Sequence, residues 1–197
     1  PVLDWATPNL YQSWQRFAVP NDPRFGNQWH LDNTGQEGGL VDHDANLTGA
    51  WDVNPGGSPN IVVGVVDDGV AIDHEDLTVW VNPGDVAGNG VDDDGNGWVD
   101  DVHGWNFVSN NNNSSYTSTT VSHGTAGAGV ATADGDIGLG VVGAAYHSPA
   151  ISARIFEGSS VASDADIAGA VYYMAGRTAD GTGTWDSAHI ANHSWGG

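Results

Sequence analysis

The chain has 197 residues, of which 25 are acidic and four are arginine, with no lysine and no cysteine, for a formal net charge of -21. This charge disfavours nucleic-acid binding, and the absence of cysteine excludes a disulfide scaffold and a thiolate metal site. No apolar run approaches the roughly 20 residues that a membrane helix needs, so we expect no membrane span. Such an excess of carboxylates repels itself unless cations neutralise part of it, which points to bound calcium or a salty environment.

Apolar segments along the chain alternate between strand and helix patterns. We interpret residues 1–20, which show no clear period, as an N-terminal arm or the remnant of a propeptide. Near-continuous apolar strands separated by helices predict a mostly parallel sheet with helices on both faces, which is a doubly wound α/β fold. The predicted strands are Ile61–Val66, Val141–Ala145, Ile151–Phe156 and His189–Ser194, and the predicted helices are Ala45–Trp51, His123–Thr132 and Asp164–Arg177.

Residues 81–122 interrupt this alternation with Gly, Asn, Asp and Ser, and a loop of that length is uncommon unless something organises it. Asp92, Asp94 and Asn96 alternate before a backbone carbonyl, as in the first half of an EF-hand calcium loop. The twelfth position is His103 instead of Glu, which rejects a full EF-hand. The alternative is an acidic surface turn without an ion. The predicted calcium ligands are Asp92, Asp94, Asn96, the carbonyl of Trp98, and Asp100 or Asp101 closing the loop.

The strand predicted at 61–66 runs into an acid, and the helix predicted at 123–132 begins with a histidine. In a parallel sheet the site lies at the carboxyl ends of the strands, which is where Asp67 falls. Asp67 would then hold one ring N–H of His123, and the other ring nitrogen would act as general base toward a hydroxyl group. No Gly-Thr-Ser segment that could carry a nucleophilic serine occurs, so we expect the attacking group in a segment beyond this sequence.

Four segments in order, Asn21–Leu31, Val66–Leu77, His123–Ala145 and Asn192–Gly196, resemble the subtilisin-like serine proteases, or subtilases. By this resemblance, residues 21–197 are the N-terminal part of a subtilisin-like catalytic domain that is incomplete at its C-terminus. Asp67 and His123 are then members of its catalytic triad. The resemblance also implies that Ser194, Trp195 and Gly196 line the substrate cleft and pair with the peptide, with Ser160, Val161 and Ala162 on the opposite wall.

The tandem acids Asp67 and Asp68 resemble the kexin and furin branch, in which the second acid favours a basic residue in the substrate. Asp68 is here either part of a substrate subsite or a solvated turn residue. The resemblance further implies a second calcium site, which ties the N-terminal arm to the body. Its ligands are Asp22, Asp76 and the side chain of Asp136, with carbonyls of residues 134–141, although Asp76 capping the following turn is an alternative.

We therefore predict a calcium-stabilised serine endopeptidase with Ca²⁺ as its cofactor, a peptide or protein as its substrate, and a secreted, extracellular or periplasmic location. The nucleophilic Ser and the Asn of the oxyanion hole are expected from the C-terminal remainder of the same protease, as a further segment or a cleaved chain. Without that remainder we expect this chain to be inactive. The alternative is a calcium-binding surface or interaction protein that reuses a subtilase half-domain without catalysis.

Overall fold

A computed structural model describes residues 19–116 and 122–196, so most of the predicted arm at residues 1–20 lies outside the described residues. Its centre is a four-stranded sheet with the strand order β2-β3-β1-β6. All three strand pairs are parallel, which confirms the predicted sheet. The strands are β1 (Val63–Asp67), β2 (Gly104–Asn106), β3 (Ala150–Arg154) and β6 (Ile190–Asn192).

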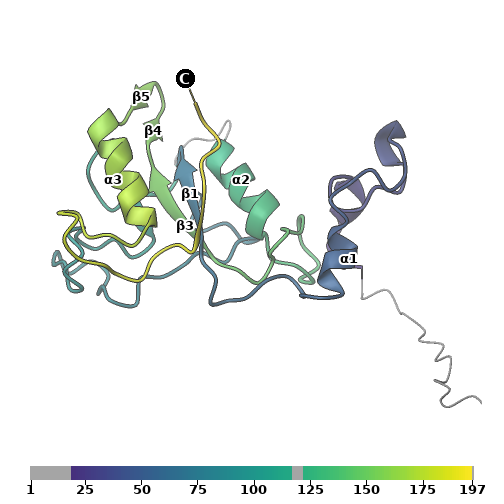
Figure 1. The fold of residues 1–197 in the computed structure, drawn as a ribbon, viewed down its shortest axis with the longest axis horizontal. Coiled ribbons are helices and arrows are strands. Elements are labelled where there is room, and N and C mark those ends of the chain that lie inside the picture. The colour runs from purple at the N-terminus through teal and green to yellow at the C-terminus, as the bar shows by residue number, and fades with distance from the viewer. Residues whose placement is uncertain (1–18, 117–121, 197) are drawn as a thin grey trace, which may run out of the picture.

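Two helices, α2 (His123–Thr132) and α3 (Asp164–Met174), flank the sheet on opposite sides (Figure 1). Neighbouring residues of a strand point to opposite faces of its sheet. Val65 belongs to the buried cluster that contains Ala128 of α2, whereas Val66 belongs to the cluster that contains Ala170 of α3. The predicted doubly wound arrangement is thus confirmed by the way β1 is shared between two cores.

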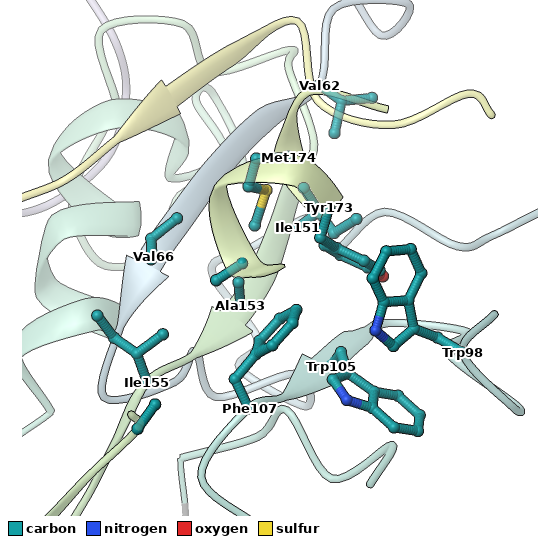
Figure 2. Close-up of a cluster of buried hydrophobic side chains, with 12 residues drawn as sticks. Val62, Val66, Trp98, Trp105, Phe107, Ile151, Ala153, Ile155, Tyr173 and Met174 are labelled. Atoms are coloured by element: carbon teal, nitrogen blue, oxygen red, sulfur yellow. The ribbon is translucent and has the colours of Figure 1, made fainter. Parts of the chain in front are cut away.

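The core under α3 is rich in aromatic side chains (Figure 2). The ring of Trp98 meets that of Tyr173 edge to face, with 4.8 Å between the centroids. Trp98 and β2 both belong to the long acidic segment. Residues 81–116 are therefore attached to the rest of the fold in two ways, through the buried ring of Trp98 and through the backbone hydrogen bonds of β2 in the sheet. The labelled members are Val62, Val66, Trp98, Trp105, Phe107, Ile151, Ala153, Ile155, Tyr173 and Met174.

The remaining elements are short. A two-stranded antiparallel hairpin follows β3 directly. Its residue Phe156 was predicted as the end of the strand that became β3, and its second strand was not predicted because two residues carry no readable period. None of the helices in residues 19–116 and 122–196 combines the length and the apolar character that crossing a bilayer requires. These elements are η1 (Phe25–Asn27), η2 (Gln36–Gly38), α1 (Leu47–Trp51), β4 (Phe156–Glu157) and β5 (Ser160–Val161).

The predicted strand Val141–Ala145 is wrong, because this segment forms no strand. The side chain of Gln28 occupies the place of a neighbouring strand: its Nε2 donates to the carbonyl of Val142 at 2.8 Å, and its Oε1 accepts from the Val142 N–H at 2.9 Å. The Gly143 N–H donates to the carbonyl of Ala133 just past the end of α2, at 2.8 Å. The apolar run is therefore buried as a loop, in the small cluster that Val142 shares with Phe25 and other residues near the N-terminus.

Candidate active site

Asp67 and His123 meet at the carboxyl end of the central strand. Asp67 is the last residue of β1 and is 3% exposed, and His123 is the first residue of α2. Nδ1 of His123 lies 2.8 Å from Oδ2 and 2.9 Å from Oδ1 of Asp67. The His123 side chain is 60% exposed. A buried carboxylate at this distance fixes the ring orientation and holds a proton on Nδ1, which leaves Nε2 able to accept one.

The turn after β1 supports this pair through its backbone. The Asp68 N–H donates to Oδ1 of Asp67 at 2.8 Å. Three residues on, the Ala71 N–H donates to Oγ1 of Thr125 in the first turn of α2, at 3.0 Å. The strand end that carries the acid and the helix start that carries the histidine are therefore linked by more than the Asp67 to His123 contact.

Ser122 is a site residue that the sequence reading missed. It is the N-cap of α2, with extended backbone angles, and its Oγ accepts the Thr125 N–H at 3.1 Å. Serine directly before a helix is a recognised N-cap signal and could have identified it.

Asp68, predicted either as a subsite residue or as a solvated turn residue, is half-buried and has both carboxylate oxygens engaged. Oδ1 accepts the Gly124 N–H at 2.7 Å, and Oδ2 accepts the His123 N–H at 3.1 Å. The side chain therefore contacts the start of α2.

The two predicted cleft walls come together at the same end of the sheet, where β4, β5 and the C-terminal segment gather (Figure 1). Trp195 packs edge to face on Phe156 of β4, with 6.3 Å between centroids, and its Nε1 donates to the carbonyl of Val66 at 2.9 Å. Val161 is 57% exposed, whereas Ala162 is buried. The other predicted wall residues, Ser160, Ser194 and Gly196, are exposed.

The residues predicted for the N-terminal calcium site lie around the loop that follows α2. Asp22 accepts the Asp136 N–H at 2.8 Å and the Ile137 N–H at 3.3 Å. The Asp136 carboxylate accepts the Asn21 N–H at 3.1 Å, which ties the start of the described chain to this loop. Asp22 and Asp136 are thus neighbours, because the carboxylate of Asp22 accepts the backbone N–H of Asp136.

Asp76 is the residue of this set that best fits a cation. It is 4% exposed, its Oδ2 accepts the Val141 N–H at 3.0 Å, and its Oδ1 is buried without a hydrogen-bond partner. Burial, and less strongly the nearby charges of Asp22 and Asp134, raise the pKa of Asp76 above its ordinary value. A buried carboxylate oxygen without a partner is costly, and a bound cation would offset that cost.

The acidic segment brings together a carboxylate group that differs in part from the predicted one. Asp85, Asp92 and Asp94 have ligand atoms that all lie within 4.8 Å of one another. It is the one group of three or more such side chains found among the described residues. Asp85 was missed because it lies seven residues before Asp92, outside the alternating pattern. Burial is the main cause that raises the pKa of Asp94.

The other predicted ligands of this loop have protein partners. Asn96 is fully buried, and its Oδ1 accepts the Trp98 N–H at 2.8 Å. The Asp100 carboxylate accepts the N–H groups of Asn89 and Gly90, at 3.1 and 3.0 Å. Asp101 accepts from the Tyr173 hydroxyl at 2.7 Å, and burial raises the pKa of Asp101 to about 7. Neither Asp100 nor Asp101 belongs to the group of three carboxylates.

Comparison with known proteins places the chain in a family. The family model of the subtilases matches residues 58–197. "Neuroendocrine convertase 2" of Drosophila melanogaster is 47% identical over 58 residues, which cover 29% of this chain and 9% of that protein. "PC3-like endoprotease variant B" of Hydra vulgaris is 43% identical over 63 residues, which cover 32% of this chain and 9% of that protein. The matched regions thus span about a tenth of these relatives' length.

Two solved structures share the fold over most of the chain. A serine protease of Aeromonas sobria, in complex with a chaperone, superposes with a TM-score of 0.66 and 26% sequence identity over 92% of this chain and 26% of its own. A protease of Pseudoalteromonas arctica superposes with a TM-score of 0.63 and 24% identity, over 91% of this chain and 51% of its own. The second likeness bears on the fold alone.

Proposed function

Because the chain belongs to the subtilase family, we propose that Asp67 and His123 are the acid and the base of an Asp-His-Ser triad in a serine endopeptidase. The observation that carries this proposal is the 2.8 Å contact between Oδ2 of the buried Asp67 and Nδ1 of His123. Asp67 orients the ring, and His123 takes the proton from the attacking hydroxyl and returns it to the leaving amine. The contact joins a strand end to a helix start, and the acid precedes the base in the chain, which is the order found in subtilisin.

The nucleophilic serine and the oxyanion-hole asparagine come from a further segment of the same protease. Within the described residues, no serine hydroxyl forms a hydrogen bond with the His123 ring. A substrate peptide would lie between the β4–β5 hairpin and residues 194–196, and we propose Ser160, Val161, Ala162, Ser194, Trp195 and Gly196 as the residues that contact it. We also propose that the protein acts outside the cytoplasm.

Peptide hydrolysis by the full-length protein tests this function. The purified protein should cleave a protein substrate, and His123→Ala should lower kcat by about six orders of magnitude while the protein remains folded. The matched control is His147→Ala. His147 lies on the loop after α2 and is not part of the Asp67 to His123 contact. Equal activity of His123→Ala and the wild type would remove the proposal.

Calcium is the cofactor that the donor set favours. Carboxylate and carbonyl oxygens are the ligands that Ca²⁺ prefers, and no cysteine is present to favour a softer metal. The unpartnered buried oxygen of Asp76 supports a site with Asp22 and Asp136, although the carboxylates of these three residues do not all lie within 4.8 Å of one another. The group of Asp85, Asp92 and Asp94 supports a second site, beside Asn96 and Trp98. Bound calcium would supply structural charge neutralisation at both places and would take no part in the proton transfers.

A further inference from the structure

The carboxylate of Asp68 completes the hydrogen bonding at the start of α2. The first N–H groups of a helix have no partner within the helix and need one from outside. Asp68 accepts two of them, from His123 and Gly124, and Oγ of Ser122 accepts a third, from Thr125. The next N–H, of Ala126, already donates to the Ser122 carbonyl within the helix. Every N–H of the first turn therefore has a partner, and for two of them that partner is the Asp68 carboxylate.

This contact depends on how closely the helix start approaches the strand end. A Cβ atom at Gly124 would lie 2.5 Å from the carbonyl oxygen of Gly69 and 3.0 Å from Oδ1 of Asp68. Both distances are shorter than ordinary van der Waals contact, so the absence of a side chain at position 124 allows this approach. The approach brings the backbone N–H of His123 to one Asp68 oxygen while its ring meets Asp67.

The charge of Asp68 also suits its place. A helix N-terminus carries partial positive charge, which a carboxylate within the first turn stabilises. Asp68 directly follows Asp67, so one strand end contacts both the ring and the backbone of His123. A basic side chain of a substrate would have to bind the same two Asp68 oxygens that already accept the N–H groups of His123 and Gly124.

We propose that Asp68 is a positioning residue that holds the base-bearing helix in the place where His123 can work with Asp67. This role rests on the proposed peptidase function and differs from both a substrate-selecting role and a solvated turn. It predicts that loss of Asp68 slows the chemical step on every substrate to the same degree. A subsite role predicts a loss confined to substrates with a basic residue at the second position before the scissile bond.

The experiment compares Asp68→Ala and Asp68→Asn in the full-length protein on two peptides. The peptides differ only in carrying Ala or Arg at the second position before the scissile bond. Asp68→Ala removes both acceptors and should lower kcat at least tenfold on both peptides, with KM within about twofold of wild type. Asp68→Asn retains one acceptor oxygen but places an NH₂ against the other N–H group, and should recover part of kcat on both peptides. Asp73→Ala is the matched control, because Asp73 is an exposed acid five residues further along the chain.

Two results would overturn the positioning role. One is an equal loss in both Asp68 variants that is confined to the Arg peptide and lies in KM. The other is an unchanged kcat for Asp68→Ala, measured well below its melting temperature. Amide hydrogen exchange at residues 122–126 separates this proposal from the peptidase proposal. Suppose that the wild type hydrolyses no peptide but Asp68→Ala still speeds amide exchange at residues 122–126. The contact between Asp68 and α2 is then supported, whereas the peptidase proposal and the catalytic role of Asp68 are contradicted.

Discussion

Oδ2 of Asp67 lies 2.8 Å from Nδ1 of His123, although the two residues are 56 positions apart in the chain. Asp67→Asn keeps the size of the side chain but can place an NH₂ against Nδ1, which then accepts a hydrogen bond and leaves the ring proton on Nε2, the wrong tautomer. We expect kcat of the full-length protein to fall by about 10⁴ with little change in KM. Steady-state kinetics on one peptide measures this, and a change confined to KM would contradict the role of Asp67.

The buried oxygen of Asp76 predicts a dependence of stability on calcium. At 100 times the dissociation constant, a bound ion adds about 2.7 kcal/mol, which corresponds to roughly 5–10 °C in Tm for a domain of this size. A chelator should therefore lower Tm by that amount, and Asp76→Asn should lower it in calcium and remove part of the chelator effect. Glu75→Gln, an exposed neighbour, should behave as wild type. No chelator effect on the wild type would exclude structural calcium.

The group of Asp85, Asp92 and Asp94 predicts a second, separable calcium site. Asp85→Asn removes one of its three charges and should weaken or abolish one binding event in a calorimetric calcium titration while leaving the other. Asp93→Asn changes an exposed acid in the same loop that is not part of the group, and should leave both events in place. A loss of the same event in Asp93→Asn would contradict the assignment.

The close approach at Gly124 predicts an asymmetric response to alanine along α2. Gly124→Ala forces a methyl group against the Gly69 carbonyl and should destabilise the protein by about 2 kcal/mol and reduce kcat. Gly129→Ala is in the same helix with nothing within 4 Å of the added atom, and should stabilise by about 0.5–1 kcal/mol through higher helix propensity. Urea unfolding of both variants measures the difference, and equal effects would argue against the tight contact.

The raised pKa of Asp101 predicts the sign of a pH effect on stability. Its folded pKa of about 7 lies above the ordinary value of 3.8, so the folded chain binds more protons than the unfolded chain between these limits. Stability from this group is therefore present at low pH and is lost as pH rises towards about 7. In calcium-free buffer, the fall in unfolding free energy between pH 5 and about 8 should be shallower in Asp101→Asn. An unchanged slope would contradict the raised pKa.

The sequence predicted best those features that depend on local patterns. The helix His123–Thr132 has the predicted bounds, because a run of small residues follows the histidine, and the acid and the histidine meet as their order implied. The strand at 141–145 was wrong because a glutamine side chain 114 positions away replaces the neighbouring strand. Asp85 and the helix contact of Asp68 were missed for the same reason: tertiary folding creates both, and no local spacing marks either one.

Labelling with a fluorophosphonate tests the central claim most directly, because such a reagent reacts with a serine that a histidine base activates. The full-length protein should take up one label, which peptide mass spectrometry should place on a serine outside residues 1–197, and His123→Ala should lose it. Labelling that is absent from the wild type, that falls on a serine within residues 1–197, or that persists in His123→Ala would contradict the claim that Asp67 and His123 serve a serine supplied by a further segment.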